Sequence, residues 1–284
     1  MDIAVLGMGR MGQAVAHRLL EGGHSVRVWN RTAGRAGPVV GAGATEAGSI
    51  AEAAKGADVV ITSLANDDAV REVALGSGGV AGSLEGPTVY LDASTVSPAM
   101  AGELAEAIPR YAAMPILGAP VAVASGQAIF LLGGSDDVLE VAVPLARSLS
   151  NSVRRYPEPQ LAGAAKLAVN TLLLDVVVAL SEAFAVGRAG GLTEDQLADL
   201  LSASPIVPPG IANRFEGILR GGQQGWWSPA LGAKDAGLAV DLAASDGHQL
   251  PVTAAARDQY ERTAAAEVGG PGDIADVTTR YRSD

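Results

Sequence analysis

The sequence predicts an α/β fold, with a doubly wound parallel sheet first and an all-helical domain, built on a long central helix, after it. Three observations predict this. Short apolar runs alternate with helical segments up to about residue 158, a glycine-rich turn joins the first run to the first helix, and no strand pattern follows Pro157-Glu158-Pro159. Such alternation is typical of a parallel sheet covered by helices. Because 284 residues are too many for one ordinary core, we place two domains at 1–158 and 159–284.

The first half of the chain is a succession of strands and helices. Its strands are predicted from short runs rich in Val, Ile and Leu. They are Asp2–Leu6, Ser25–Trp29, Asp58–Ser63, Thr88–Asp92, Arg110–Ile116, Ala128–Leu132 and Val153–Tyr156. Helical spacing predicts helices at Gln13–Leu20 and Asp136–Leu149. Another helix is predicted after Ser97-Pro98, because Pro suits the first position of a helix.

The second half is predicted to contain helices alone. Leu161–Ala189 is apolar on nearly every face, which predicts a long helix buried all round, in a domain core or a subunit interface. Further helical segments are predicted near residues 193–203, 210–220, 229–246 and 251–267.

Composition excludes several classes of function. The net charge of −11 argues against nucleic acid and anionic membranes as partners. Without cysteine there is no disulfide, thiolate metal site or catalytic thiol, and we expect no metal. The N-terminus does not resemble a signal peptide. The most apolar stretch is interrupted by Lys166, Asp175, Glu182 and Arg188, so no uncharged run approaches the roughly 20 residues of a membrane span. We therefore expect a cytoplasmic protein with no membrane partner.

The glycine-rich turn predicts a dinucleotide site. It fits G-x-G-x-x-G, follows a predicted strand and opens a predicted helix, and it reads Gly7-Met8-Gly9-Arg10-Met11-Gly12. Glycines in this pattern allow a tight turn, close approach of the backbone to a pyrophosphate, and close packing of helix on strand. The helix N-terminus supplies N–H donors for the same phosphates. In this strand–turn–helix context the pattern indicates a Rossmann domain.

The end of the second strand predicts which dinucleotide binds. An NAD site usually has an acid here for the ribose 2′-hydroxyl, whereas an Arg suits a 2′-phosphate. This chain has Asn30, Arg31 and Thr32, with no carboxylate to repel a phosphate. We therefore predict NADP(H). A solvated surface charge is the alternative interpretation of Arg31.

Two more strand ends are predicted to face the cofactor, because ligands lie at the carboxyl ends of parallel strands. They are Ser63-Leu64-Ala65 and Ala93-Ser94-Thr95. Ordinary loop and capping chemistry is the alternative, above all for Ser94.

A lysine on the long helix is the predicted catalytic group. Lys166 and Asn170 are four residues apart and share one face of the helix. Of the 20 Lys and Arg residues only three are Lys, and one of these is on the apolar helix. A buried lysine can give up its proton, whereas an arginine cannot. A lysine whose ammonium reaches the surface is the alternative.

These features together resemble the β-hydroxyacid dehydrogenases. That group includes 3-hydroxyisobutyrate dehydrogenase and the glyoxylate and succinic semialdehyde reductases, and it is related to 6-phosphogluconate dehydrogenase. The resemblance rests on the glycine turn, the G-x-x-K-x-x-x-N pattern of residues 163–170 and the pair Lys234-Asp235. It implies that Lys166 is the general acid/base, that Asn170 holds a substrate carboxylate, and that Lys234 lies against the nicotinamide cofactor. It also implies that Asp235 orients its neighbours and that a homodimer covers the apolar helix.

One segment departs from the family pattern. The family usually has D-x-P-V-S-G-G after the Rossmann core, where this chain has Ala113-Met114-Pro115-Ile116-Leu117-Gly118-Ala119. Ala113 stands in place of the acid and Leu117 in place of the serine. We predict that Leu117, Gly118 and Ala119 contact the substrate, and the loss of the hydroxyl favours a bulkier or less polar one. Trp226-Trp227 could line such a pocket, with packing as the alternative.

The sequence thus predicts an NADP(H)-dependent oxidoreductase. Hydride would pass from NADPH to a small carbonyl or semialdehyde, or from a 3-hydroxyacid in reverse, and Lys166 would transfer the proton. Two alternatives remain open. One is an imine reductase of the same architecture, a class that commonly has Asp or Tyr where Lys166 stands. The other is a non-catalytic NADP(H) sensor, which would have no need of Lys166 and Asn170.

Overall fold

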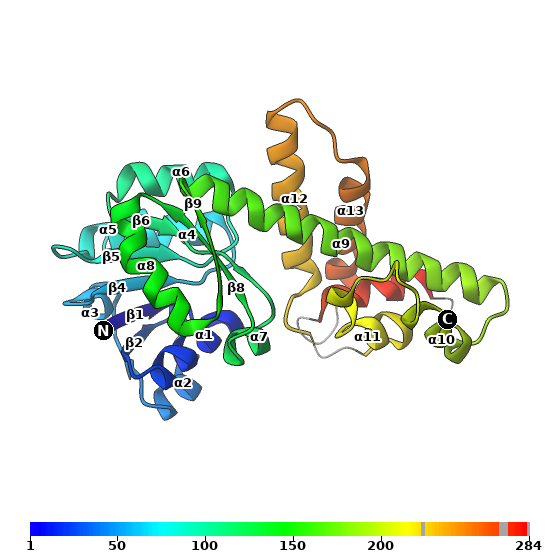
Figure 1. The fold of residues 1–284 in the computed structure, drawn as a ribbon, viewed down its shortest axis with the longest axis horizontal. Helices are drawn as coiled ribbons and strands as arrows, with labels where there is room; N and C mark the ends of the chain where they lie inside the picture. Colours follow the sequence, from blue (N-terminus) through cyan, green and yellow to red (C-terminus); the bar gives the residue numbers. More distant parts are fainter. Residues whose placement is uncertain (223–224, 267–271, 283–284) are drawn as a thin grey trace. The chain divides into compact units, whose positions relative to one another are not determined.

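The computed structural model describes residues 1–222, 225–266 and 272–282. The chain divides into two compact units, residues 1–166 and 167–284. Helix α9 (Pro159–Ala189) runs through this division (Figure 1). The domain boundary predicted near residue 158 falls where α9 begins. The first turns of α9 nevertheless belong to the first unit, because Ala162 and Ala165 pack in one of its hydrophobic cores.

The first unit is built on a nine-stranded sheet in the order β3-β2-β1-β4-β5-β6-β8-β7, with β9 paired to β8. Strands β1 to β6 are parallel in the order of a Rossmann sheet, whereas β8 is antiparallel to β6 and β7. The strands are β1 Asp2–Leu6, β2 Ser25–Trp29, β3 Thr45–Glu46, β4 Val59–Thr62, β5 Val89–Asp92, β6 Tyr111–Ala113, β7 Ile116–Leu117, β8 Ile129–Gly134 and β9 Ser152–Tyr156.

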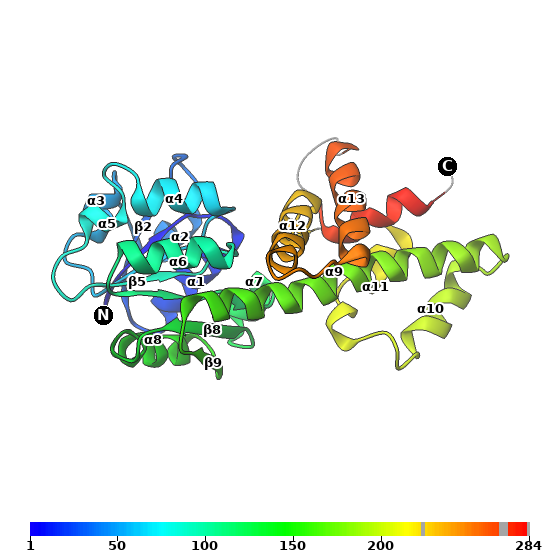
Figure 2. The same cartoon turned by 90° about the horizontal axis from the view of Figure 1, so that it is seen from above.

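Helices cover both faces of this sheet. They are α1 Arg10–Glu21, α2 Gly37–Gly41, α3 Ile50–Ala54, α4 Asp67–Leu75, α5 Val80–Ser83, α6 Pro98–Ala107, α7 Pro120–Ala124 and α8 Asp136–Leu149. Helices α1, α2, α7 and α8 pack on one face, and α3 to α6 pack on the other (Figure 2). Along β1, Ile3 and Val5 enter the first core while Ala4 and Leu6 enter the second. Burial on both faces explains why the strands are continuous apolar runs.

Most predicted strands are confirmed to within two residues at each end, and β1, β2 and α8 have the predicted bounds. The cap before α6 is also confirmed, because the Ser97 hydroxyl accepts the Met100 N–H and Pro98 opens the helix. The single strand predicted over Arg110–Ile116 is wrong. It is two strands, β6 and β7, separated by Pro115, whose missing N–H cannot take part in a ladder. The short elements β3, α2 to α5 and α7 were not predicted from the sequence.

The described part of the second unit contains helices and no strand, as predicted. After α9 the helices are α10 Glu194–Ser202, η1 Pro209–Ile211, α11 Phe215–Arg220, α12 Pro229–Ser245, α13 Pro251–Ala266 and η2 Ile274–Tyr281. Residue 267, the predicted end of the segment 251–267, lies outside the described residues. The core of the unit forms where Leu174, Val177 and Phe184 of α9 meet side chains of the other helices.

Helix α9 is not covered on all sides within the single chain. Leu172 and Val186 are 67% and 73% exposed, and Val169 is also exposed. The described residues therefore do not provide the burial predicted for this helix. By length and composition alone α9 could also span a membrane. A core helix of a globular domain meets the same criterion, and α9 supplies much of the core of the second unit.

Candidate active site

Three glycines shape the turn between β1 and α1, each for a different reason. Gly7 has φ +100°, and a Cβ placed on it would lie 2.3 Å from the Ser63 carbonyl oxygen. A Cβ on Gly12 would lie 1.9 Å from the Gly7 carbonyl oxygen, so α1 can approach the turn only without a side chain there. A Cβ on Gly9 would meet nothing within 4 Å. Gly9 therefore borders open space at the N-terminus of α1, as a pyrophosphate site requires.

Asn30 ties this turn to the end of β2. Its side-chain oxygen accepts the Met8 N–H at 2.8 Å, and its side-chain nitrogen donates to the Thr32 carbonyl at 2.8 Å. Gln13 adds a bond from its amide to the Met8 carbonyl at 3.0 Å. Asn30 thus fixes the shape of the glycine turn as well as removing the usual carboxylate from this position.

Arg31 lies on the surface beside the turn. Its guanidinium is 3.2 Å from Glu72 of α4, and the two side chains are 76% and 65% exposed. An exposed pair of this kind is weak, so the guanidinium can exchange Glu72 for a phosphate. Thr32 and Arg10 are also exposed here. The position suits a 2′-phosphate, and the alternative of a surface charge stays open.

The carboxyl ends of β4 and β5 are joined by side-chain hydrogen bonds. The Ser94 hydroxyl accepts the Leu64 N–H at 2.8 Å, and the Ser94 N–H donates to Asp92 Oδ1 at 3.1 Å. Thr62, the last residue of β4, donates its hydroxyl to the same Asp92 oxygen at 2.7 Å. Leu64 and Ser94 are therefore directly bonded at this edge, and Ala65 is exposed next to them. That Ser63, Leu64, Ala65 and Ser94 face the cofactor stays a prediction.

Lys166 reaches the same edge of the sheet from α9. Its ammonium donates to the Ile116 carbonyl oxygen at 2.6 Å, so the helix is anchored to β7. Lys166 also lines a small cavity with Asp92, Ser94, Thr95, Ala113 and Pro115, among others. The cavity is small: the volume open to the centre of a water molecule is about 10 Å³, which is enough for about one water. The predicted catalytic lysine and the predicted strand-end residues thus come together in the first unit.

The segment predicted to contact the substrate follows Ile116 directly. Leu117 ends β7, is half-buried and packs against the core on the α3–α6 face. Gly118 has φ +126°, a conformation that favours glycine, and Ala119 precedes α7. The bond from Lys166 to Ile116 places the lysine next to this segment. The structure therefore bonds Lys166 to the residue that precedes Leu117, whereas Leu117, Gly118 and Ala119 do not line the cavity that Lys166 lines.

Asn170 and Lys234 form a separate cluster in the second unit, around a buried carboxylate. Asn170 donates its side-chain amide to Asp235 Oδ2 at 2.8 Å. The Lys234 ammonium lies 2.5 Å from Asp235 Oδ1. Asn170 and Asp235 are buried, whereas Lys234 is partly exposed. Asp235 therefore contacts both residues, and the orienting role implied by the family resemblance stays a prediction.

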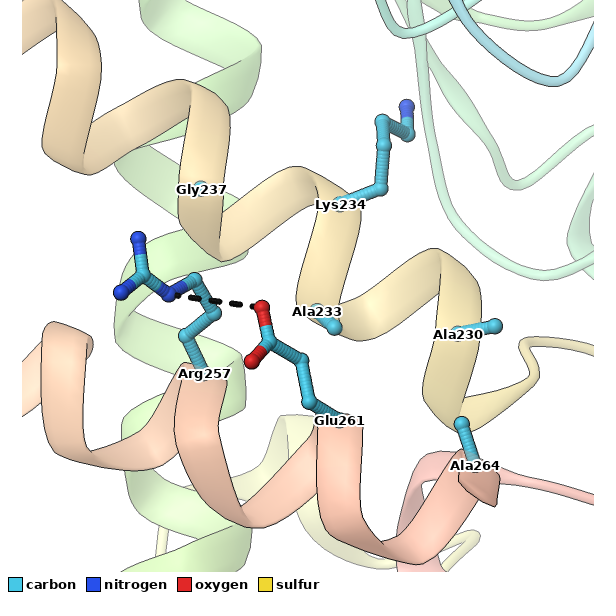
Figure 3. Close-up of a pocket in the computed structure, with 7 residues that line it drawn as sticks. All are labelled: Ala230, Ala233, Lys234, Gly237, Arg257, Glu261 and Ala264. Carbon is cyan, nitrogen blue, oxygen red and sulfur yellow. Dashed lines mark ion pairs between the residues drawn. The ribbon is translucent and has the colours of Figure 1, made fainter.

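Lys234 also borders a groove between α12 and α13 (Figure 3). Arg257 and Glu261 of α13 point toward one another, 3.6 Å apart, and the Lys234 side chain extends away from them. The remaining lining residues are small: Ala230, Ala233, Gly237 and Ala264. Among the described residues, no three His, Asp or Glu side chains gather in a way that could hold a metal ion.

Trp226 and Trp227 lie beside Arg214 in the second unit. The Arg214 guanidinium lies 4.4 Å from the centre of the Trp226 ring, and Trp227 packs against the core of the second unit. Arg214 itself forms a buried ion pair with Asp273 at 2.7 Å. The backbone N–H groups of both tryptophans donate to the same Asp273 carboxylate.

Asp92 is the residue of this site that sequence reasoning missed. In the sequence it is an acid at the end of the apolar run that forms β5. An acid at that place is typical of an ordinary strand end, so it did not indicate a functional residue. The structure shows it 1% exposed, in contact with the edge that carries Ser94. Burial raises the pKa of its carboxyl, although bonds from Ser94 and Thr62 act in the opposite direction.

Comparison with known families covers nearly the whole chain. Residues 2–156 match the NAD binding domain of 6-phosphogluconate dehydrogenase. Residues 162–281 match the NAD-binding domain of NADP-dependent 3-hydroxyisobutyrate dehydrogenase. The two matches divide at the start of α9, close to the predicted boundary.

Individual relatives agree with the family matches. The uncharacterized oxidoreductase YfjR of Bacillus subtilis is 34% identical, over 92% of this chain and 93% of the relative. An NAD-dependent L-serine dehydrogenase of Pseudomonas aeruginosa is 30% identical over 91% of each chain. The solved 3-hydroxyisobutyrate dehydrogenase of Mycobacterium tuberculosis, studied with L-serine, superposes with a TM-score of 0.84 at 26% identity and 99% coverage of both chains.

A second solved structure bears on the imine-reductase alternative. The Streptomyces aurantiacus imine reductase superposes with a TM-score of 0.64 at 24% identity and 100% coverage of both chains, a likeness of fold alone. The glycine cradle, the lysine at the end of the sheet and the matches over both units lead to one assignment. The chain belongs to the β-hydroxyacid dehydrogenase family of NAD(P)-dependent oxidoreductases, with a nucleotide-binding domain of the 6-phosphogluconate dehydrogenase type.

Proposed function

We propose that this protein is an NADP(H)-dependent oxidoreductase that interconverts a small carbonyl or semialdehyde and the corresponding hydroxy compound, with Lys166 as general acid/base. The observation that carries the proposal is the place of Lys166. It lines a cavity with Ser94 and Thr95 at the carboxyl end of β5, and its ammonium is held by the Ile116 carbonyl. Cofactors of doubly wound sheets lie at this edge.

The glycine cradle supports a dinucleotide here. Gly9 leaves open space in front of the N-terminus of α1, and Gly7 and Gly12 admit no side chain. Bound NADPH supplies a hydride to the carbonyl carbon. As negative charge develops on the carbonyl oxygen, the Lys166 ammonium stabilises it and donates a proton to it. In the reverse direction the neutral amine of Lys166 accepts the proton of the hydroxyl group.

Residues near Lys166 are given supporting roles. Leu117, Gly118 and Ala119 follow the carbonyl that holds the lysine, so we place the non-reacting part of the substrate against them. Leu117 offers an apolar surface, which favours a substrate with an apolar group. Asn170 and Lys234, both held by Asp235, are assigned to a substrate carboxylate and to the cofactor respectively.

The preference for NADP(H) rests on the end of β2. The uncharged Asn30 side chain is bonded to Met8 and Thr32, and Arg31, which follows it, is an exposed cation. We expect Arg31→Leu to raise the KM for NADPH at least about tenfold, as loss of a charge-assisted hydrogen bond does. The KM for NADH is the internal control and should change little. Equal effects on both cofactors would contradict the assignment.

The reaction itself is tested by a substrate panel. Purified protein would be mixed with NADPH and, separately, short-chain semialdehydes, glyoxylate and cyclic imines, and absorbance at the nicotinamide band followed. Oxidation of NADPH by one or more carbonyl compounds is the expected result.

Two other outcomes would replace the proposal. Turnover of cyclic imines without turnover of carbonyls would identify an imine reductase. Binding of NADPH without oxidation by any compound would identify a sensor. The lysine at position 166, bonded next to the substrate segment, favours the carbonyl reductase over both.

A further inference from the structure

The reaction proposed above leaves one buried ionisable group unused. Asp92 is the last residue of β5 and is 1% exposed. A carboxyl group is costly to bury, so its surroundings must account for it. Its Oδ1 accepts the Thr62 hydroxyl at 2.7 Å and the Ser94 backbone N–H at 3.1 Å.

These bonds lead in two directions from Asp92. Toward the interior, the Thr62 hydroxyl is 2.8 Å from the hydroxyl of Tyr90, which is fully buried. Toward the edge of the sheet, the Ser94 hydroxyl accepts the Leu64 N–H at 2.8 Å. Because the Ser94 N–H donates to Asp92, the carboxylate fixes the backbone of the residue whose hydroxyl accepts from Leu64. Asp92 thus orients the residues at the carboxyl ends of β4 and β5.

The other carboxyl oxygen of Asp92 faces different surroundings. Asp92 Oδ2 is buried and has no hydrogen-bond partner among the described residues. Asp92 lines the small cavity that Lys166 also lines. In the register of the sheet its partner on β6 is Ala113, the position at which the family pattern has an acid. The small side chain of Ala113 leaves room beside Asp92 for about one water.

We propose that Asp92 is a positioning residue, which holds the Ser94 hydroxyl and the Leu64 amide in the orientation needed to bind the nicotinamide end of the cofactor. The inference rests on the proposed function in one respect only, namely that a nicotinamide dinucleotide occupies this edge. The buried carboxyl does not touch the cofactor. It acts through Ser94, and its shape and hydrogen-bonding capacity matter more than its charge.

Two substitutions separate positioning from charge. Asp92→Ala removes every bond to Ser94 and frees the strand ends. Asp92→Asn keeps an acceptor for Thr62 and Ser94, and its amide N–H groups face a cavity with room for water. We expect Asp92→Ala to weaken NADPH binding about tenfold, the equivalent of one strong hydrogen bond, and Asp92→Asn to restore it to within about threefold of wild type.

The matched control is Thr62→Val, which has the shape of Thr but donates nothing. It breaks the bonds to Asp92 and Tyr90, and so disturbs the same buried cluster, but leaves the chain from Asp92 through Ser94 to Leu64 intact. Its melting temperature should fall, as that of Asp92→Ala should, while its affinity for NADPH stays close to wild type. If Asp92 contributed to folding alone, Thr62→Val and Asp92→Ala would have similar melting temperatures and similar affinities for NADPH.

The experiment is a fluorescence titration of each variant with NADPH, without substrate, beside a melting curve. Ser94→Ala and the double variant Asp92→Ala/Ser94→Ala complete a cycle, and effects well below additive are expected because both residues act through one chain of bonds. Loss of affinity in Thr62→Val equal to that in Asp92→Ala, or no rescue by Asp92→Asn, would overturn the positioning role. Failure of the wild type to bind either NADPH or NADH would instead overturn the proposed function.

Discussion

Substitution by alanine should have different effects at two glycines of the turn after β1: loss of NADPH affinity at Gly9 and loss of stability at Gly12. At Gly9 an added methyl group meets nothing within 4 Å, so Gly9→Ala should fold like the wild type. Its Cβ would enter the space assigned to the pyrophosphate, and we expect affinity for NADPH to fall at least about tenfold. Gly12→Ala places its Cβ 1.9 Å from a backbone oxygen and should lower the melting temperature sharply. Melting curves and NADPH titrations of both variants test this, and a stable Gly12→Ala variant would contradict it.

Because the Asp92 carboxyl is buried, we expect the free energy of unfolding to depend on pH. Burial raises the pKa of this carboxyl in the folded state, so the folded protein binds a proton there more tightly than the unfolded chain. The stability that Asp92 contributes is therefore complete below its unfolded pKa of about 4 and is lost as pH rises through the folded value. Relative to Asp92→Asn, the wild type should become less stable as the pH rises above about 4.

Urea denaturation of the two proteins at several pH values would measure that difference. The groups that act on the Asp92 carboxyl are Tyr90, Tyr111 and Asp67, together with the hydroxyls of Thr62 and Ser94. All of these are unchanged in the variant. Stability curves that run parallel over this range would show that the pKa of Asp92 is not raised.

The single residues of this site differ in how far the sequence reveals them. Gly7, Gly9 and Gly12 stand in a recognisable spacing, and Lys166 is a rare lysine on an apolar helix. Asp92 has no such signal, because its burial depends on which strands lie beside β5. The Ile116 carbonyl that holds Lys166 could not be predicted either, since it is 50 residues away and belongs to the backbone.

At the scale of elements, one buried ion pair joins three parts of the second unit. Arg214 precedes α11, Asp273 precedes η2, and the Asp273 carboxylate also accepts the N–H groups of Trp226 and Trp227. Arg214→Met would leave that carboxylate buried without its cation. We expect the free energy of unfolding to fall by about 3–5 kcal/mol, as when one partner of a buried pair is removed.

Arg71→Met is the control for this variant. Arg71 pairs with Glu103 on the surface, and the two side chains are 46% and 42% exposed. Exposed pairs contribute little, so its denaturation midpoint should stay near that of the wild type. Equal losses of stability in the two variants would show that the Arg214–Asp273 pair is not specially important.

Elements were predicted well where local pattern and packing agree. The strands β1 and β2 and helix α8 had correct bounds because their apolar spacing is determined by the cores on which they pack. The segment 110–116 was taken as one strand because its apolar run is continuous, but Pro115 interrupts the ladder. Short elements such as α2 and α5, with four or five residues each, have too few turns to show a helical period.

At the scale of the whole molecule, the exposed side of α9 predicts self-association. Leu172 and Val186 are large apolar side chains that the single chain leaves exposed. We expect a homodimer in which a second copy covers them, because an apolar surface on a long helix is stabilised by burial. The Leu172→Glu/Val186→Glu variant should be a monomer by light scattering, whereas the wild type should be a dimer.

Val121→Glu is the matched control for the dimer. Val121 on α7 is exposed to the same extent as Leu172, at 67%, but belongs to the first unit. The control should remain dimeric. A monomeric wild type, or a control that dissociates like the α9 variant, would contradict the prediction. Sequence alone indicated that α9 needs cover, but which of its residues stay exposed became visible only in the structure.

The account as a whole depends on the ammonium group of Lys166, and Lys166→Met tests it most directly. The variant keeps the length of the side chain and removes the proton donor. With Lys55→Met, an exposed lysine of the first unit, as control, the turnover of each protein on a reducible carbonyl and its affinity for NADPH would be measured. We predict that Lys166→Met loses about a hundredfold or more in kcat, the usual contribution of a general acid, with unchanged NADPH affinity. Turnover within about tenfold of the wild type would contradict the assignment of Lys166 as the general acid/base.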